Sequence, residues 1–269
     1  MPDSPPFSLE TPIASGRTAE IYAWGDNHIL KLTRADFPSH LADQEWHNAR
    51  VAWQSGAPAP EPVEIIAVAG RRGVVFARVD GPNMAQCMQR SPLSISAYAR
   101  QLAGLHAELH TISAPDFSSQ HQRVAWNLER STMLSEPLKA AVYQTLGKLP
   151  DDDTICHGDF HPENILLAEL GPVIIDWEGC MHGSPAADVA GTCLWIRSAL
   201  MFGKGFRGWI VRQIGRRFER AYLAEYNRLA PGQLGHLEAW IAVLAACRLR
   251  ADNRPEHKYL LQLTETLST

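Results

Sequence analysis

The sequence predicts an α+β protein in which a small antiparallel β-rich N-lobe with one helix precedes a larger, mostly helical C-lobe. Three observations lead to this prediction. Short β-prone runs separated by turn residues fill the first 80 residues. Apolar residues recur at helical spacing from residue 94 onward. The turn-forming sequence Asp-Gly-Pro-Asn at 80–83 ends the last β-prone run before the helical part begins. We therefore expect lobes at 1–80 and 81–269, with 80–83 as the hinge.

The elements of the N-lobe follow from local signals. Strands are predicted over 7–15, 18–25, 28–33, 63–69 and 73–79. Glycine-containing turns separate the first three, at Gly16 and at residues 25–27. Ser39 is typical of an N-cap and Gly56 of a helix end, which predicts a helix over about 40–54.

The C-lobe is predicted mainly from helical periodicity. A helix is expected over 94–111, and two more are expected within 122–148. The apolar run at 172–177 predicts a short buried strand. From Ala186 to the end the pattern is helical, with loops near 203–205 and 230–235.

Composition excludes several classes of protein. The chain has 269 residues, 45% hydrophobic and 20% charged, which suits one large globular domain or two intimate lobes. The first ten residues lack the basic and apolar regions of a signal peptide, and the longest apolar run near the C-terminus, at 239–247, is too short to span a bilayer. The five cysteines are scattered, which favours free thiols in the cytoplasm over disulfides or a zinc site. A net charge of −4 weighs against a nucleic-acid partner.

The sequence HGDFHPENILL at 157–167 contains the polar residues that are candidates for catalysis and metal binding. Asp159 lies in a polar turn, Asn164 follows five positions later, and Asp176 ends the run VIID. Phosphoryl transfer needs a carboxylate near the acceptor hydroxyl and separate oxygen ligands for Mg²⁺, and these residues supply both. His157 and His161 have the spacing of a helical zinc pair, but Pro162 argues against a continuous helix, and their roles are left open.

The sequence HGDFHPENILL followed by VIIDWE resembles the signature of the aminoglycoside phosphotransferase and choline kinase superfamily, which has the protein-kinase-like fold. Protein kinases have H-R-D-x-x-x-x-N and D-F-G at these places. Gly158 in place of the Arg, and Asp176-Trp177-Glu178 in place of D-F-G, are typical of the small-molecule branch. The resemblance covers about residues 10–195, and no A-P-E sequence follows downstream.

This resemblance implies further site residues. Gly16 would lie in the loop that covers the phosphates, and Lys31 would bind them, with Glu45 as its partner and Asp43 as a competitor. Residues 76–83, which include Arg78 and Asp80, resemble the segment whose backbone binds adenine. Asp188 resembles the residue that supports the catalytic loop through backbone N–H groups.

The expected activity is Mg²⁺- and ATP-dependent transfer of the γ-phosphoryl group to a hydroxyl of a small molecule. Asp159 is the expected catalytic base, and Asn164 and Asp176 are the expected metal ligands. An aminoglycoside-resistance kinase and a nucleotide-binding pseudokinase without turnover are the alternatives. The acceptor, the choice between ATP and GTP, and the oligomeric state stay open.

Charge distribution bears on the acceptor. Residues 1–199 hold 14 Lys and Arg against 23 Asp and Glu, a balance of −9, whereas residues 200–269 hold 11 against 6, a balance of +5. Polycations prefer acidic sites, so the basic C-terminal part favours a neutral or anionic acceptor. The alternative is that these arginines lie on solvated helix faces.

Overall fold

The structure is a computed structural model that describes residues 11–114, 116–201, 205–249 and 256–268. The chain forms two compact units. The first contains the described residues up to Met84 together with Glu163–Gly179, and the second contains Ala85–Pro162 and the described residues from Cys180 onward. The expected boundary at 80–83 takes no account of the segment 163–179, which packs with the first unit.

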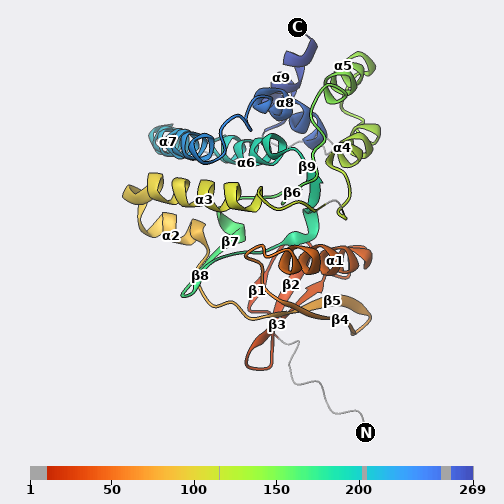
Figure 1. Ribbon diagram of the computed structural model, residues 1–269, viewed down its shortest axis with the longest axis vertical. Coiled ribbons are helices and arrows are strands. Elements are labelled where there is room, and N and C mark those ends of the chain that lie inside the picture. Colours follow the sequence, from red (N-terminus) through yellow and green to blue (C-terminus); the bar gives the residue numbers. More distant parts are fainter. Residues whose placement is uncertain (1–10, 115, 202–204, 250–255, 269) are drawn as a thin grey trace. The chain divides into compact units, whose positions relative to one another are not determined.

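The first unit is built on a five-stranded antiparallel sheet in the order β1-β2-β3-β5-β4 (Figure 1, red to orange). Its strands are β1 (Ala14–Ser15), β2 (Ala19–Trp24), β3 (His28–Thr33), β4 (Pro62–Val68) and β5 (Arg71–Ala77). Side chains alternate between the faces, so Leu30 and Leu32 enter the core with Tyr22 and Val75, while Lys31 points to the opposite face. Residues 7–10 of the strand predicted over 7–15 lie outside the described residues.

Helix α1 (His40–Gln54) has the predicted bounds and packs against β4 and β5. Ser39 occupies the N-cap position, but its backbone is already helical and its side chain makes no capping hydrogen bond. Gly56 follows the helix with φ of 83°, a conformation that favours glycine, as predicted for a helix end.

The segment 163–179 forms a hairpin in the first unit. A 3₁₀ turn, η2 (Pro162–Asn164), leads into β7 (Ile165–Ala168), which pairs with β8 (Gly171–Ile174), and η3 (Trp177–Gly179) follows. The strand predicted over 172–177 is therefore too long. It ends at Ile174 because Asp176 has φ of 69°, in the left-handed region that no strand residue adopts.

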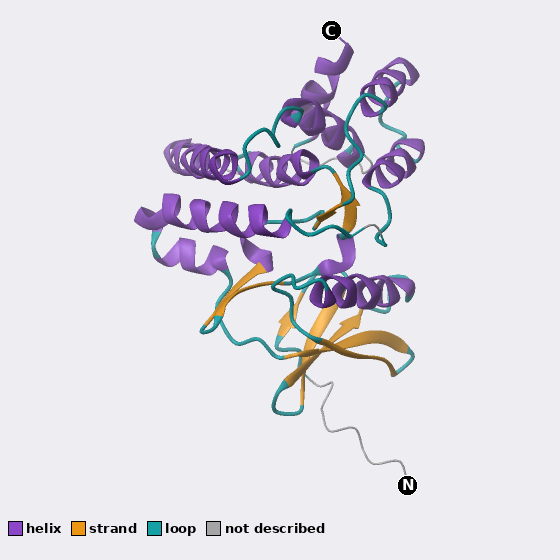
Figure 2. Cartoon of the chain, in the orientation of Figure 1, coloured by secondary structure: helices purple, strands orange, loops and turns teal. Residues whose placement is uncertain are grey.

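The second unit is mostly helical, as Figure 2 shows. Its helices are α2 (Met84–Arg90, of which Met84 belongs to the first unit), α3 (Ile95–Leu109), α4 (Gln120–Glu129), α5 (Glu136–Leu146), α6 (Pro185–Ala199), α7 (Gly205–Leu229), α8 (Leu237–Arg248) and α9 (His257–Glu265), with 3₁₀ turns η1 (Pro92–Ser94) and η4 (Thr266–Ser268). Helices α3 and α7 lie side by side, and α6 packs on α8.

Two features of this unit are absent from the sequence prediction. They are helix α2 and a short antiparallel pair formed by β6 (Thr154–Cys156) and β9 (Met181–Gly183). Of the loop predicted near 203–205, residues 203 and 204 lie outside the described residues, and Gly205 begins α7. Within the described part of the chain, no helix combines the length and apolar character needed to cross a bilayer. The predicted α+β class is confirmed.

Candidate active site

Lys31 lies at the centre of an ionic cluster in the first unit. Its Nζ is 2.6 Å from Glu45 Oε1 on α1 and 2.7 Å from Asp176 Oδ1, which follows β8. Glu45 is buried, and only 14% of the Lys31 side chain is exposed. The fold thus brings together three polar residues that are distant in sequence, on the sheet face opposite Leu30 and Leu32.

The competitor Asp43 lies elsewhere on the same helix. Its Oδ1 is 2.5 Å from Arg72 Nη2, and both side chains are about half exposed. Because residues 43 and 45 are two positions apart on a helix, their side chains cannot face the same neighbour. Of the two candidates, the structure places Glu45 against Lys31.

The cluster contains more negative than positive charge. Carboxylate oxygens of Glu45, Asp176 and Glu178 lie within 4.8 Å of one another, and the first two pair with the Lys31 ammonium. Burial alone would lower the pKa of Lys31, but the carboxylates of Glu45 and Asp176 raise it above its ordinary value. Burial raises the pKa of Glu45 to about 7 against the influence of Lys31, and burial also raises the pKa of Glu178. The cluster is therefore suited to a cation.

Helix α1 also fixes the backbone next to Asp176. Asn48 Nδ2 donates to the carbonyl oxygen of Trp177 at 3.0 Å, and Gln44 Nε2 donates to that of Glu178 at 3.1 Å. The indole N–H of Trp177 donates to the carbonyl of Ile174 at 2.9 Å. The sequence analysis did not identify Gln44 or Asn48. The available signal was the position of Asn48 three residues after Glu45, on the same helical face.

The hairpin β7–β8 places Asn164 and Asp176 at the same end of the segment. Ile165 pairs with Ile174, and Ile175 N–H donates to the Asn164 carbonyl at 2.9 Å. A carboxylate and an amide oxygen are ligands that Mg²⁺ accepts, and nearby Glu178 adds a further oxygen donor. The donor set therefore fits Mg²⁺ in kind and in charge.

Asp159 belongs to the second unit, in the loop after β6. Its side chain is 53% exposed, and its Oδ2 lies 3.3 Å from His161 Nε2. The His161 ring stacks on Trp195 with centroids 4.7 Å apart. The loop therefore offers an accessible carboxylate beside a stacked imidazole ring.

The backbone of this loop is held by Asp188 at the start of α6. Its Oδ2 accepts from His157 N–H at 2.6 Å, and its Oδ1 accepts from Gly158 N–H at 2.8 Å. Gly158 has φ of 79°, which explains why glycine suits this position. The structure therefore places Asp188 in the supporting contact that the sequence indicated.

The remaining predicted residues lie on or next to the strands of the first unit. Gly16 N–H donates to the Ala19 carbonyl at 2.9 Å, closing the turn between β1 and β2. Arg78 Nε lies 2.8 Å from Asp80 Oδ1, and both side chains are exposed. Their part in nucleotide binding stays a prediction.

Comparison with known proteins identifies the family to which the chain belongs. Residues 10–232 match the phosphotransferase enzyme family. Acyl-CoA dehydrogenase family member 11 from Gallus gallus is 26% identical over 203 residues, which cover 64% of this chain and 26% of that protein. This chain thus spans about a quarter of the length of that relative.

Solved structures of aminoglycoside phosphotransferases are similar in fold. Aminoglycoside-3'-phosphotransferase of type VIII has a TM-score of 0.63 at 20% identity, covering 91% of this chain and 93% of that one. A thermostable mutant of APH(4)-Ia in a ternary complex with AMP-PNP and hygromycin B has a TM-score of 0.66 at 13% identity, covering 96% and 92%. The streptomycin–ATP–APH(2")-IIa complex has a TM-score of 0.61 at 16% identity, covering 97% and 94%. The predicted superfamily resemblance and its protein-kinase-like fold are confirmed.

Proposed function

Because the chain belongs to the phosphotransferase enzyme family, we propose that it transfers the γ-phosphoryl group of ATP, with Mg²⁺, to a hydroxyl group of a small molecule. The observation that carries this proposal is the Lys31 cluster, in which a buried ammonium is held by Glu45 at 2.6 Å and Asp176 at 2.7 Å. A strand Lys paired with a helix Glu, beside a metal-binding Asp, is the arrangement that phosphoryl transfer requires in protein kinases.

The first unit is proposed to bind the nucleotide. Lys31, held by Glu45, orients the α- and β-phosphates. Asn164 and Asp176 would hold Mg²⁺, which neutralises phosphate charge when bound. Gly16 would approach the phosphates through its backbone, and the backbone of 76–83, including Arg78 and Asp80, would meet the adenine. The excess of carboxylates around Lys31 supports the metal assignment, because an added cation would balance it.

Asp159 is proposed as the catalytic base. It orients the acceptor hydroxyl and takes its proton as the new bond between the acceptor oxygen and the γ-phosphorus forms. The bond from that phosphorus to the β,γ-bridging oxygen breaks, and ADP leaves. The 53% exposure of the Asp159 side chain, on a backbone fixed by Asp188, supports this role because a base must be both accessible and oriented.

The acceptor is proposed to be neutral or anionic, since the C-terminal part carries a balance of +5. Two of the described arginines of α7 already have partners within the protein. Arg228 pairs with Glu225, and Arg217 donates to Ser96. An aminoglycoside is the second candidate, because the similar solved structures include complexes with hygromycin B and with streptomycin.

The pseudokinase alternative is disfavoured because Lys31, Glu45, Asp159, Asn164 and Asp176 are all present. The five cysteines form no disulfide, all lying within the described residues, which supports the cytoplasm as the proposed location.

The test is ADP release from Mg-ATP across a panel of aminoglycosides, macrolides, choline, ethanolamine, thiamine, homoserine and simple sugars. Asp159→Asn serves as the blank. We expect acceptor-dependent release that Asp159→Asn lowers by about 10²- to 10⁴-fold, the usual contribution of a general base. Full activity in this variant would overturn the assignment of the base. No activity with any acceptor, together with intact nucleotide binding, would favour the pseudokinase alternative.

A further inference from the structure

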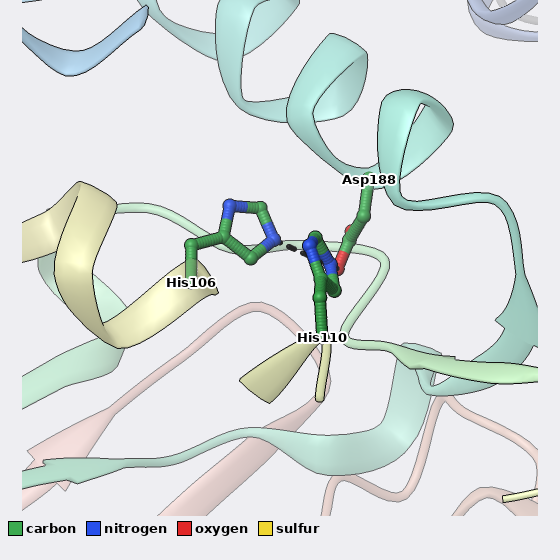
Figure 3. Close-up of side chains that lie close together, drawn as sticks. All are labelled: His106, His110 and Asp188. Atoms are coloured by element: carbon green, nitrogen blue, oxygen red, sulfur yellow. Dashed lines mark hydrogen bonds and ion pairs between the residues drawn. The ribbon is translucent and has the colours of Figure 1, made fainter. Parts of the chain in front are cut away.

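A buried group of polar side chains surrounds Asp188 in the second unit, and the proposed transfer leaves its histidines without a role. His106 lies in the last turn of α3 and His110 is the residue that follows its end, and both rings point toward the Asp188 carboxylate (Figure 3). Their Nε2 atoms lie 3.0 Å and 3.4 Å from Asp188 Oδ2. The side chains of these three residues are at most 3% exposed, so their hydrogen bonds must be satisfied mainly within the protein.

Each histidine has a second partner on α7. Nδ1 of His106 lies 2.6 Å from the Tyr222 hydroxyl, and Nδ1 of His110 lies 2.6 Å from the Tyr226 hydroxyl. Both pairs of residues have a spacing of four, which places each pair on one face of its helix. Because α3 and α7 lie side by side, the two His–Tyr contacts link the same helices one turn apart.

The direction of each hydrogen bond follows from Asp188. An ionised carboxylate only accepts, so Nε2 of each histidine donates to it. Nδ1 of a neutral ring then accepts the phenol O–H. Burial lowers the pKa of His106 to about 3. Burial alone would raise the pKa of Asp188, but the hydrogen bonds from His106 and His110 hold it well below its usual range.

The same network reaches the chain on both sides of Asp159. Before it, Asp188 accepts the backbone N–H groups of His157 and Gly158. After it, the His106 ring stacks on Phe160 with centroids 3.9 Å apart. Thr192, one turn after Asp188 on α6, donates its hydroxyl to the Phe160 carbonyl at 2.7 Å. Asp159 is thus an exposed residue whose neighbours in the loop, His157, Gly158 and Phe160, are held by contacts with this network.

We propose that His106 and His110 are positioning residues for Asp159, which they control by fixing the Asp188 carboxylate that holds the loop. This inference rests on the proposed phosphotransfer, in which Asp159 accepts the hydroxyl proton. A misplacement of about 1 Å at a reacting group can lower a rate by about 100-fold, so a support of this kind affects kcat strongly. Nucleotide binding, assigned to the first unit, should be affected little.

The test compares two substitutions of one histidine. His106→Leu keeps a similar volume but removes the donor to Asp188, whereas His106→Gln keeps an N–H donor at the end of the side chain. His121→Leu is the matched control, because His121 bonds a backbone carbonyl at Pro150 and lies edge-on to Trp240, away from the hydrogen bonds described for Asp188. Tyr222→Phe, which removes one hydroxyl at unchanged shape, replaces His106→Leu if that variant fails to fold.

Acceptor-dependent kcat and the affinity for ADP with Mg²⁺ are measured for each variant, together with the folded fraction. We expect His106→Leu to lose about 10- to 100-fold in kcat, as for other residues that orient a functional group, while the ADP dissociation constant changes little. His106→Gln should regain part of the loss. A loss in His106→Leu no larger than in His121→Leu, or an equal loss in both His106 variants, would overturn the proposal.

A second measurement separates this proposal from the proposed function. Amide hydrogen exchange of a peptide covering residues 156–161 needs no turnover. Faster exchange in His106→Leu than in the wild type and in His121→Leu would support the network, even if no acceptor gave turnover. Unchanged exchange would overturn the network, even if the phosphotransfer were established.

Discussion

The Lys31 cluster of the first unit and the Asp188 network of the second both contain buried charged groups, but they balance charge differently. The carboxylates of Glu45 and Asp176 pair with the ammonium of Lys31, and a Glu178 oxygen lies within 4.8 Å of theirs. The single carboxylate of Asp188 receives N–H groups from the backbone and from His106 and His110. The first arrangement has more carboxylates than ammonium groups, whereas in the second the protein itself supplies the donors to its one carboxylate. Under the proposals above, this difference separates a site that binds a cation from a network that positions the Asp159 loop.

The largest effect is expected from removing the metal carboxylate. Asp176→Ala should reduce acceptor-dependent turnover to the level of the blank, because it removes the negatively charged ligand proposed for Mg²⁺ and leaves only the neutral amide of Asn164. It should also abolish the increase in ADP affinity that Mg²⁺ produces, as measured by calorimetry with and without the metal. Asp159→Asn should keep that increase. Turnover that survives in Asp176→Ala would contradict the assignment.

A smaller effect is expected at the partner of Lys31. Glu45→Gln removes a charged hydrogen bond, which contributes about 1.5–3 kcal/mol, so kcat/KM for ATP should fall by about 10- to 100-fold. Asp43→Asn is the matched control on the same helix, and its exposed pair with Arg72 contributes only about 0–1 kcal/mol. Steady-state kinetics at saturating acceptor give both values. Equal losses in the two variants would remove the distinction between Glu45 and Asp43.

The pH dependence of stability tests whether the Asp188 network keeps His106 neutral. Because burial lowers the pKa of His106 to about 3, the unfolded chain binds a proton between about pH 3 and 6.5 that the folded chain does not. The free energy of unfolding should therefore rise with pH across this window, by up to about 1.4 kcal/mol per pH unit from this group.

His106→Gln lacks this titration, so its stability should rise less steeply from pH 5 to 6.5 in urea unfolding experiments. The raised pKa of Glu45 acts in the opposite direction but is present in both proteins, so it cancels in the difference between them. Parallel curves for the wild type and the variant would show that His106 is not kept neutral by its surroundings.

The smallest effect is expected at the exposed pair after β5. Arg78→Ala should change stability by less than about 1 kcal/mol, because exposed ion pairs contribute little. If residues 76–83 meet adenine through their backbone, the KM for ATP should also change by less than about threefold, the factor that roughly 0.6 kcal/mol gives. A much larger rise in KM would mean that the Arg78 side chain itself contacts the nucleotide.

The sequence was sufficient for the residues whose neighbours are set by local patterns. Lys31 could be placed in a predicted strand between Leu30 and Leu32, and its expected role came from the family resemblance. The sequence predicted the bounds of helix α1 but left Glu45 and Asp43 as alternatives, and only the ion pairs in the structure select Glu45. The signature from His157 to Glu178 then identified the expected catalytic base and metal ligands by their order in the sequence. The α+β class and the family followed from these local signals together.

The Asp188 network could not be predicted because its members are distant in sequence. His106 lies 82 residues from Asp188 and 116 from Tyr222, and on its own it has the pattern of an ordinary helical residue. The strands β6 and β9 have three residues each, too few for alternation to be visible. The shortened strand before Asp176 reflects a backbone conformation that the apolar run VII does not reveal.

The positive φ of Asp176 has a consequence for selection on this protein. A non-glycine residue in that conformation costs about 1 kcal/mol relative to glycine, and the ion pair of Asp176 with Lys31 acts against this cost. Keeping the carboxylate there therefore sets stability against activity at a single residue. Asp176→Gly would relieve the backbone strain and keep the fold, but under the proposed function the protein would lose phosphotransfer.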